Sequence, residues 1–125
     1  MLIASVGLQW ALIMTVATEG ILRNGLGWAA GNRPEDSETR ASGPMIKRMQ
    51  RASANLLENL PLFAALVLVA HVAGRANDTT ALGAQIFVAA RVAHAVIYVA
   101  GIPWIRTVVW AVSIAGMALI ASALF

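Results

Sequence analysis

Residues 52–74 read ASANLLENLPLFAALVLVAHVAG and contain one charged side chain, that of Glu58. A helix of about 20 mainly apolar residues is long enough to cross the hydrocarbon core of a bilayer. We therefore interpret this stretch as a membrane-spanning helix. Pro44 suits the first turn of the same helix, whose polar start carries Lys47, Arg48 and Arg51.

Three further apolar segments surround this one. Residues 2–22 carry only Glu19, residues 81–102 carry only Arg91, and residues 104–125 carry only Arg106. The first segment lacks the basic start of a signal peptide, so we expect a span there as well. The sequence thus predicts one all-α domain over residues 1–125, an integral membrane bundle of four helices with spans at 2–22, 52–74, 81–102 and 104–125.

The composition excludes several classes of function. The chain has 125 residues, of which 59% are hydrophobic and 12% charged, about half the charge of a typical soluble domain. The net charge of +3 is spread through apolar sequence, without the aromatic-interleaved basic patch that binds single-stranded nucleic acid. Cysteine is absent, so a reactive thiol has to come from a substrate. Two distant histidines do not make a metal site.

Basic residues indicate the orientation in the membrane. Residues 32–43, NRPEDSETRASG, form the only strongly polar stretch and are expected to be a solvent loop. On the opposite side of the bundle the only basic residue is Arg75. The positive-inside rule then predicts that the loop side, residues 23–51, faces the cytoplasm and that both termini lie outside. The preference for arginine over lysine, together with the many alanines, suggests a GC-rich bacterial genome and hence a bacterial plasma membrane.

Charged residues inside the apolar segments demand an explanation, because each costs roughly 2.5–3.5 kcal/mol near the centre of a spanning helix. Their spacing places them in stripes, since residues three or four apart share one helix face. One stripe comprises Arg48, Arg51, Asn55 and Glu58; a second comprises Arg91, His94 and Tyr98; Glu19 and Arg23 form a third. Lipid cannot face such stripes, so we expect them to face each other or a wet cavity.

Internal pairing is one explanation of these charges, with Glu58 beside Arg91 and Glu19 beside Arg23. However, the arginines near the cytoplasmic side outnumber the acids there, and the excess positive charge suits a ligand that carries carboxylates. His94 can be either a packing residue or a site residue. The remaining polar or small positions are expected to serve the membrane belt or helix packing: Trp10, Trp28, Trp104 and Trp110, and Ala111, Ala115, Ala118 and Ser122.

Two segments resemble a known family. Residues 51–61, RASANLLENLP, resemble the second-helix signature of the MAPEG family, the membrane-associated proteins of eicosanoid and glutathione metabolism. Residues 91–110, RVAHAVIYVAGIPWIRTVVW, are similar to the third-helix and fourth-helix region of the family's prostaglandin E synthase branch. GILR at residues 20–23 fits the arginine that ends the family's first helix. The resemblance covers all four spans in order.

The resemblance implies a homotrimer that holds glutathione between neighbouring subunits near the cytoplasmic side. It implies that Arg106 acts near the sulfur, and that Thr107 takes the place of a serine proposed to act on the thiol. The implied ligand contacts are Arg23 from the adjacent subunit and Arg48, Arg51, Asn55, Glu58, Arg91, His94, Tyr98 and Trp110. The chain departs from the pattern at Ala54, where members often have arginine, and at Trp110, commonly tyrosine.

The chemistry that follows is glutathione transfer, or glutathione-dependent peroxide reduction, on a lipophilic electrophile from the bilayer. Two other classes of protein stay open. The family also includes non-catalytic lipid-binding scaffolds. The departures at Ala54 and Trp110 are compatible with such a function here. A small multidrug exporter has a similar length, but it needs an accessible unpaired acid, whereas Glu19 sits beside Arg23 and surplus arginines repel cationic drugs.

Overall fold

The computed structural model describes residues 1–31 and 43–125. Within this part of the chain the regular elements are all helices: α1 (Leu2–Asn24), α2 (Leu26–Ala30), α4 (Pro44–Val72), α5 (Asp78–Ala100) and α6 (Pro103–Ser122). Four of these described helices are long and apolar enough to cross a membrane. The predicted all-α membrane four-helix bundle is therefore confirmed. The predicted solvent loop, with Arg33 and Arg40, lies outside the described residues except for Gly43.

Local sequence sets the ends of the helices. Pro44 occupies the first turn of α4 and Pro103 the first turn of α6, positions where the missing N–H has no helical partner in any case. Asn77 begins α5 with a capping box, in which its side chain accepts from the Thr80 amide at 3.0 Å. Gly101 ends α5 in the left-handed conformation, with φ at 81°. Only Gly101 and Ile102 separate α5 from α6, so the two helices must pack as antiparallel neighbours.

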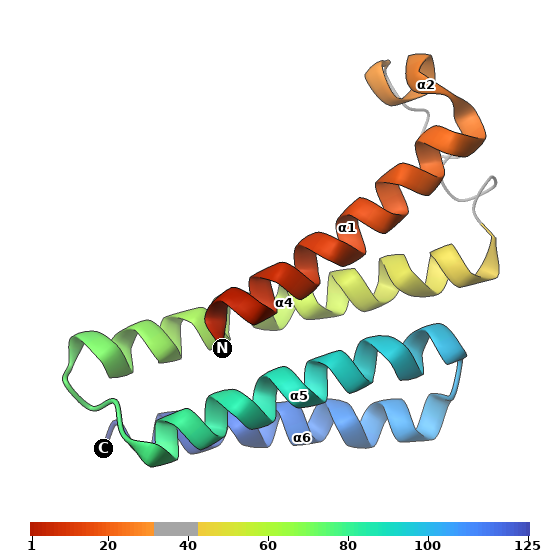
Figure 1. Ribbon diagram of the computed structural model, residues 1–125. Helices are drawn as coiled ribbons and strands as arrows, with labels where there is room; N and C mark the ends of the chain where they lie inside the picture. Colours follow the sequence, from red (N-terminus) through yellow and green to blue (C-terminus); the bar gives the residue numbers. More distant parts are fainter. Residues whose placement is uncertain (32–42) are drawn as a thin grey trace.

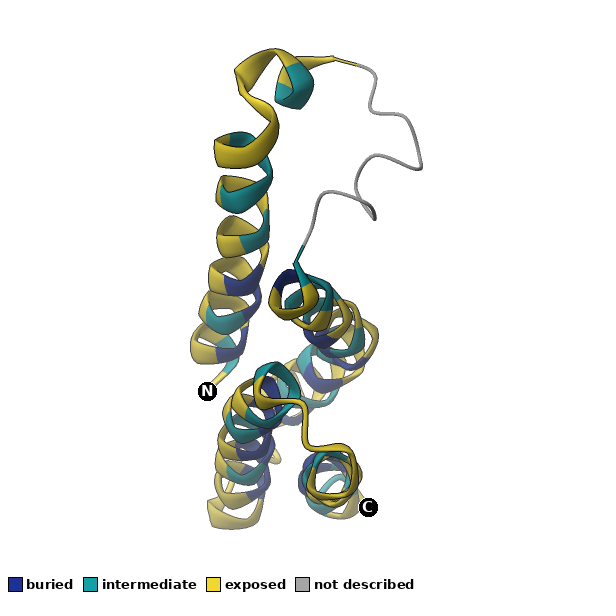
Figure 2. Cartoon of the chain, turned by 90° about the vertical axis from the view of Figure 1, so that its right-hand side faces the viewer, coloured by how far each residue is buried: buried dark blue, intermediate teal, exposed yellow. Residues whose placement is uncertain are grey.

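The helices are arranged as a close-packed group of three with a fourth inclined against it. Helices α5 and α6 run side by side, and α4 lies along them (Figure 1). Helix α1 packs on α4 through its N-terminal half, while its C-terminal end and α2 stand away from the other helices (Figures 1 and 2). Buried residues face the inside of this arrangement and exposed ones the outside (Figure 2). The outward apolar residues suit contact with lipid, for example Ile3, Val72 and Trp104.

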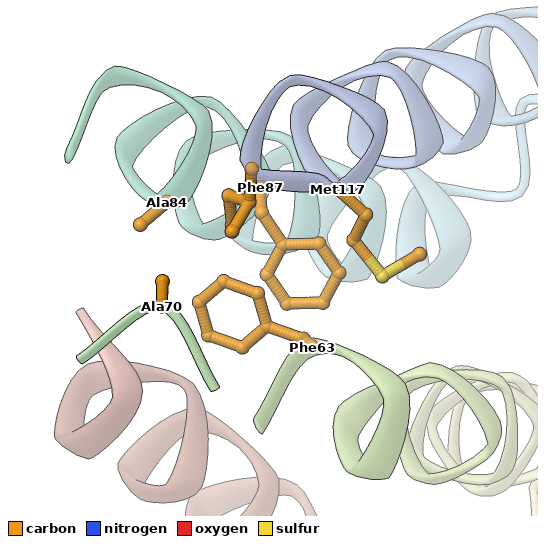
Figure 3. Packing of buried hydrophobic residues seen from close by; sticks show 6 residues of the cluster. Phe63, Ala70, Ala84, Phe87 and Met117 are labelled. Carbon is orange, nitrogen blue, oxygen red and sulfur yellow. The ribbon is translucent and has the colours of Figure 1, made fainter. Parts of the chain in front are cut away.

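The main hydrophobic core lies between α4, α5 and α6. Phe63 and Phe87 stack with ring centroids 4.0 Å apart, and Met117 packs beside them (Figure 3). Ala70 and Ala84 let α4 and α5 approach on one side of the rings (Figure 3). A smaller cluster of Leu12, Leu56 and Ala95 joins α1 to the group. The main cluster therefore joins α4, α5 and α6, and the smaller one attaches α1 to α4 and α5.

Backbone contact between two glycines brings α5 and α6 together. A Cβ atom on Gly83 would lie 2.6 Å from the Gly116 carbonyl oxygen, and one on Gly116 would lie 2.8 Å from the Gly83 oxygen. The prediction for the packing face of α6 was wrong. The four positions expected to pack, Ala111, Ala115, Ala118 and Ser122, are exposed, whereas the buried ones are Ser113, Gly116, Met117 and Ile120. Small residues recur on both sides of α6, and the glycine opposite Gly83 selects the buried side.

A buried polar contact links α1 to α4. The Gln9 side-chain nitrogen donates to the Ser53 hydroxyl at 2.9 Å, and Gln9 is buried. Such contacts between membrane helices contribute about 0.6 kcal/mol on average. The sequence analysis did not single out Gln9, although a lone amide in an otherwise apolar span is a signal that could have identified it.

Candidate functional site

A polar cleft lies where α4, the end of α5 and the start of α6 meet. Its volume is about 230 Å³, and the residues that line it are Asn55, His94, Tyr98, Arg106, Thr107 and Trp110. All six were named from the sequence as candidate site residues, and the structure brings them together. The cleft lies toward the end of the bundle where α5 passes into α6, the end that the basic residues predict to be cytoplasmic.

The cation and the rings of the cleft contact one another. The guanidinium carbon of Arg106 lies 4.6 Å from the centre of the Tyr98 ring, within cation–π distance. His94 meets the same ring edge-on, at 5.5 Å between centroids. Residues 94 and 98 are one turn apart on α5, which is why their rings meet on one face of the helix. Tyr98 therefore restrains the Arg106 side chain at the wall of the cleft.

The first two turns of α6 add positive potential to the cleft. Pro103 begins the helix, so Arg106 and Thr107 lie within its N-terminal end. The unpaired amides of a helix start carry a partial positive charge that favours a nearby anion. The Thr107 hydroxyl has the Pro103 carbonyl as an acceptor at 3.5 Å. Arg106 and the amides at the start of α6 thus both favour the binding of a negatively charged group.

Arg91 lies beneath the cleft and does not line it. Its side chain is 2% exposed. The two terminal nitrogens donate to Asn55, one to the side-chain oxygen at 2.9 Å and one to the backbone carbonyl at 2.7 Å. The guanidinium also lies 5.7 Å from the centre of the Phe87 ring. The structure therefore connects Arg91 to the cleft through Asn55.

Arg48 reaches the turn between α5 and α6. One of its terminal nitrogens donates to the Val99 carbonyl at 3.2 Å, one of the last carbonyls of α5. Its guanidinium lies so close to Gly101 that a Cβ there would be 2.6 Å from it. The positive φ favours glycine at position 101, whereas a Cβ there would displace only the flexible end of the Arg48 side chain. Arg48 ties the start of α4 to the turn that precedes Arg106.

Arg51 and Glu58 point away from the cleft of their own chain. Both are exposed, and Ala54 between them is exposed too. The two residues are two helix turns apart, so they lie on one face of α4. Pairing of Glu58 with Arg91 is not found, because the one ion pair in the described part of the chain joins Glu19 and Arg23.

The Arg23 side chain extends from the end of α1 toward the residue before α4, and Arg23 is not among the residues that line the cleft. Its guanidinium forms the ion pair with Glu19, one turn earlier on α1. A terminal nitrogen of Arg23 also lies 3.5 Å from the position that a Cβ on Gly43 would take. The acid of α1 is therefore paired, which counts against the exporter reading.

A second cavity, of about 440 Å³, lies at the opposite end of the bundle, between the end of α4 and the start of α5. Its walls are mainly apolar. Two of its polar residues, Asn77 and Thr80, are occupied by the capping box that they form together. His71 and Asp78 also line it, but it holds no arginine, so we place the candidate site for an anionic ligand at the cleft around Arg106.

These features define an integral membrane protein, a helix bundle with a cleft of hydrogen-bond donors and positive charge at one end. The chain matches the model of the MAPEG family over residues 1–125 and belongs to that family. The resemblance drawn from the sequence is thus confirmed. Searches of curated proteins and of solved structures returned no match. Membership makes this a membrane protein of glutathione-related or eicosanoid metabolism.

Proposed function

We propose that this protein binds glutathione in the cleft around Arg106 and directs its thiolate at lipophilic electrophiles. The reaction is transfer of the glutathionyl group to the electrophile, or reduction of a lipid-soluble peroxide by two electrons that glutathione supplies as it is oxidised to the disulfide. One observation carries the proposal: six residues named in advance from three helices line a single cleft. Arg106 and Thr107 are the candidate catalytic residues.

The polar groups of the cleft complement the charges of glutathione. The tripeptide carries two carboxylates and an ammonium group at neutral pH. Arg106 and the amide of Asn55 offer donors to a carboxylate or a peptide carbonyl, as do the hydroxyl of Tyr98 and the indole N–H of Trp110. Glu58, on the adjoining face of α4, is the acid that suits the ammonium group. A cationic or purely apolar ligand would leave these donors without partners.

The same positive potential favours the reactive form of the thiol. A free thiol has a pKa of ~8.5, so little thiolate exists at neutral pH. A guanidinium and a helix N-terminus near the sulfur stabilise the thiolate and raise the reactive fraction. In a transfer reaction the sulfur then forms a bond to the electrophilic carbon, while the leaving group departs with its electron pair.

A second copy of the chain would complete the site. Pockets for ligands of drug size generally have volumes of about 300–1,000 Å³, whereas the cleft of one chain measures about 230 Å³. Arg51 and Glu58 are exposed at the edge of an apolar helix, where lipid would be an unfavourable neighbour. In the homotrimer that we propose, Arg23 of an adjacent copy faces this surface and closes the site. The apolar contact between copies would admit the electrophile from the bilayer.

Calorimetry of the detergent-purified protein with glutathione tests the proposal. We expect saturable binding, with S-methylglutathione also binding because the thiol proton is not needed for recognition. A peptide of the same length without the two carboxylates is the matched control and should not bind. If titration with glutathione released no binding heat, and S-methylglutathione and glutathione did not compete for a common site, the assignment would be disproved.

A non-catalytic scaffold is the second candidate. It is favoured by Trp110, which places an indole where the family commonly has a phenol, and by the Pro103 carbonyl, which gives the Thr107 hydroxyl an acceptor within its own helix. Conjugation of glutathione to a generic aromatic electrophile separates the two candidates. Binding without conjugation or peroxide reduction would identify a scaffold.

A further inference from the structure

We infer that Arg91 is a positioning residue, which locks the Asn55 side chain so that its NH₂ group, and not its oxygen, serves the ligand. The inference rests on the proposed function, because it assigns the ligand to the cleft that Asn55 lines. It differs from the expectation that Arg91 itself contacts glutathione.

The first step is the direction of the Asn55 amide. A guanidinium has only donors and can accept no hydrogen bond. The Asn55 atom that lies 2.9 Å from the Arg91 terminal nitrogen must therefore be the oxygen. The amide cannot rotate by half a turn without placing two donors against each other. The NH₂ group is the part of the side chain left to face the cleft.

The second step is the rigidity of the arrangement. Arg91 holds Asn55 at two points, the side-chain oxygen and the backbone carbonyl at 2.7 Å. The remaining nitrogen of the guanidinium, Nε, is buried without an acceptor among the described residues. The two Asn55 contacts are thus the hydrogen bonds of this buried cation. Loss of either would leave a buried donor unsatisfied, which is unfavourable.

The third step is the consequence for specificity. With the Asn55 oxygen turned toward Arg91, the amide presents its two N–H groups to the ligand. Arg106 is a donor as well, so the wall formed by these two residues recognises acceptors. The chemical class that it takes is a carboxylate or a peptide carbonyl, and ammonium groups are directed elsewhere. Arg91 therefore sets the polarity of the site without touching the ligand.

A double-mutant cycle tests the role of Arg91. Arg91→Lys keeps the charge but replaces the two-point contact with a single ammonium. We expect the Kd for glutathione to rise roughly tenfold in this variant, which corresponds to about 1.4 kcal/mol. In an Asn55→Ala background the same substitution should change the Kd by less than about twofold, because the two residues act as one unit. Additive effects, or an unchanged Kd in Arg91→Lys, would overturn the inference.

Asn59→Ala is the matched control. The Asn59 side chain also donates to the Asn55 backbone carbonyl, at 2.8 Å, but does not touch the amide of Asn55. If the amide orientation matters, this variant should bind glutathione like the wild-type protein. A loss equal to that of Arg91→Lys would show that the backbone contact alone is responsible.

Asn55→Asp decides the question if Arg91→Lys does not fold. The introduced carboxylate accepts from Arg91 in the same geometry, so the melting temperature of the ligand-free protein should be maintained or raised. Glutathione affinity should fall at least tenfold, because the NH₂ donors are gone and a negative charge faces the carboxylates of the ligand. Wild-type affinity in this variant would refute the inference.

The proposed function and the inference can fail separately. If the wild-type protein binds no glutathione, the function fails, and thermal unfolding of the ligand-free single and double variants still tests the Arg91–Asn55 unit. Additive losses of stability would then refute the coupling of the two residues. If the wild-type protein binds but the cycle is additive, only the inference fails.

Discussion

Arg106 combines three properties at the scale of a single residue. It lines the cleft, it rests on the Tyr98 ring at 4.6 Å, and it lies at the positive end of α6. The cation–π contact restrains a long side chain that would otherwise lose entropy on ligand binding. Arg106 is therefore the residue to which we assign stabilisation of the thiolate.

Arg106→Ala should abolish thiolate formation while glutathione stays bound, because Asn55 and the α4 face still hold the rest of the tripeptide. The measurement is the ultraviolet absorbance of the thiolate in the complex, with binding followed by calorimetry. Arg75→Ala, which removes an arginine from the opposite end of the bundle, is the matched control and should leave the absorbance intact. An undiminished thiolate signal in Arg106→Ala would exclude Arg106 from the mechanism.

Residue spacing predicted which side chains are polar neighbours, but not which partner each one finds. Arg48, Arg51, Asn55 and Glu58 were expected on one face of the second helix. In the structure Arg48 reaches the end of α5, Asn55 binds Arg91, and Arg51 and Glu58 are exposed. A helix stripe is wide enough to serve two neighbours. The sequence alone cannot show where the contact with one neighbour ends.

At the scale of the elements, the contact between Gly83 and Gly116 makes α5 and α6 the tightest pair. Sequence periodicity located both helices, but it chose the wrong face of α6, because Ala111, Ala115 and Ala118 have the same spacing as the residues that are buried. Small residues permit close approach on either face. Only the position of a glycine on the facing helix distinguishes the two, and that is tertiary information.

Gly116→Ala should destabilise the bundle, although alanine favours a helix over glycine by about 1 kcal/mol in an open position. The added methyl would lie 2.8 Å from the Gly83 carbonyl oxygen and 2.9 Å from the Phe87 amide, so α6 has to move. We expect a lower melting temperature in detergent. Gly7→Ala, where nothing lies within 4 Å of the new methyl, is the control and should show no decrease. Equal behaviour of the two variants would contradict the close contact.

At the scale of the whole molecule, the bundle has two unlike ends. The cleft end gathers Arg48, Arg51 and Arg106, whereas the turn between α4 and α5 carries Arg75. The apolar spans and this asymmetry could both be obtained from the sequence, because hydropathy and loop charge are properties of composition. The completion of the site by a second copy, which we propose, could not be obtained in this way, since composition does not show how copies of a chain would meet.

Labelling of single cysteines tests the orientation, since the natural chain has no cysteine. Ala76→Cys lies in the turn between α4 and α5, and Ala30→Cys lies in α2 near the opposite end. In intact cells a membrane-impermeant maleimide should label Ala30→Cys only after permeabilisation, because we predict that side to be cytoplasmic. The cysteine of Ala76→Cys is predicted to lie on the outer side and should react without permeabilisation. The reverse pattern would invert the predicted topology.

The two-residue turn between α5 and α6 has a consequence for biogenesis. Gly101 and Ile102 leave no length of chain in which α5 could enter the bilayer and wait for α6. Such a short turn favours insertion of the two helices together, as one hairpin. Arg91 then reaches the hydrocarbon together with the strongly apolar α6, which offsets its unfavourable insertion. A lengthened turn would uncouple the two events and lower the yield of correctly inserted protein.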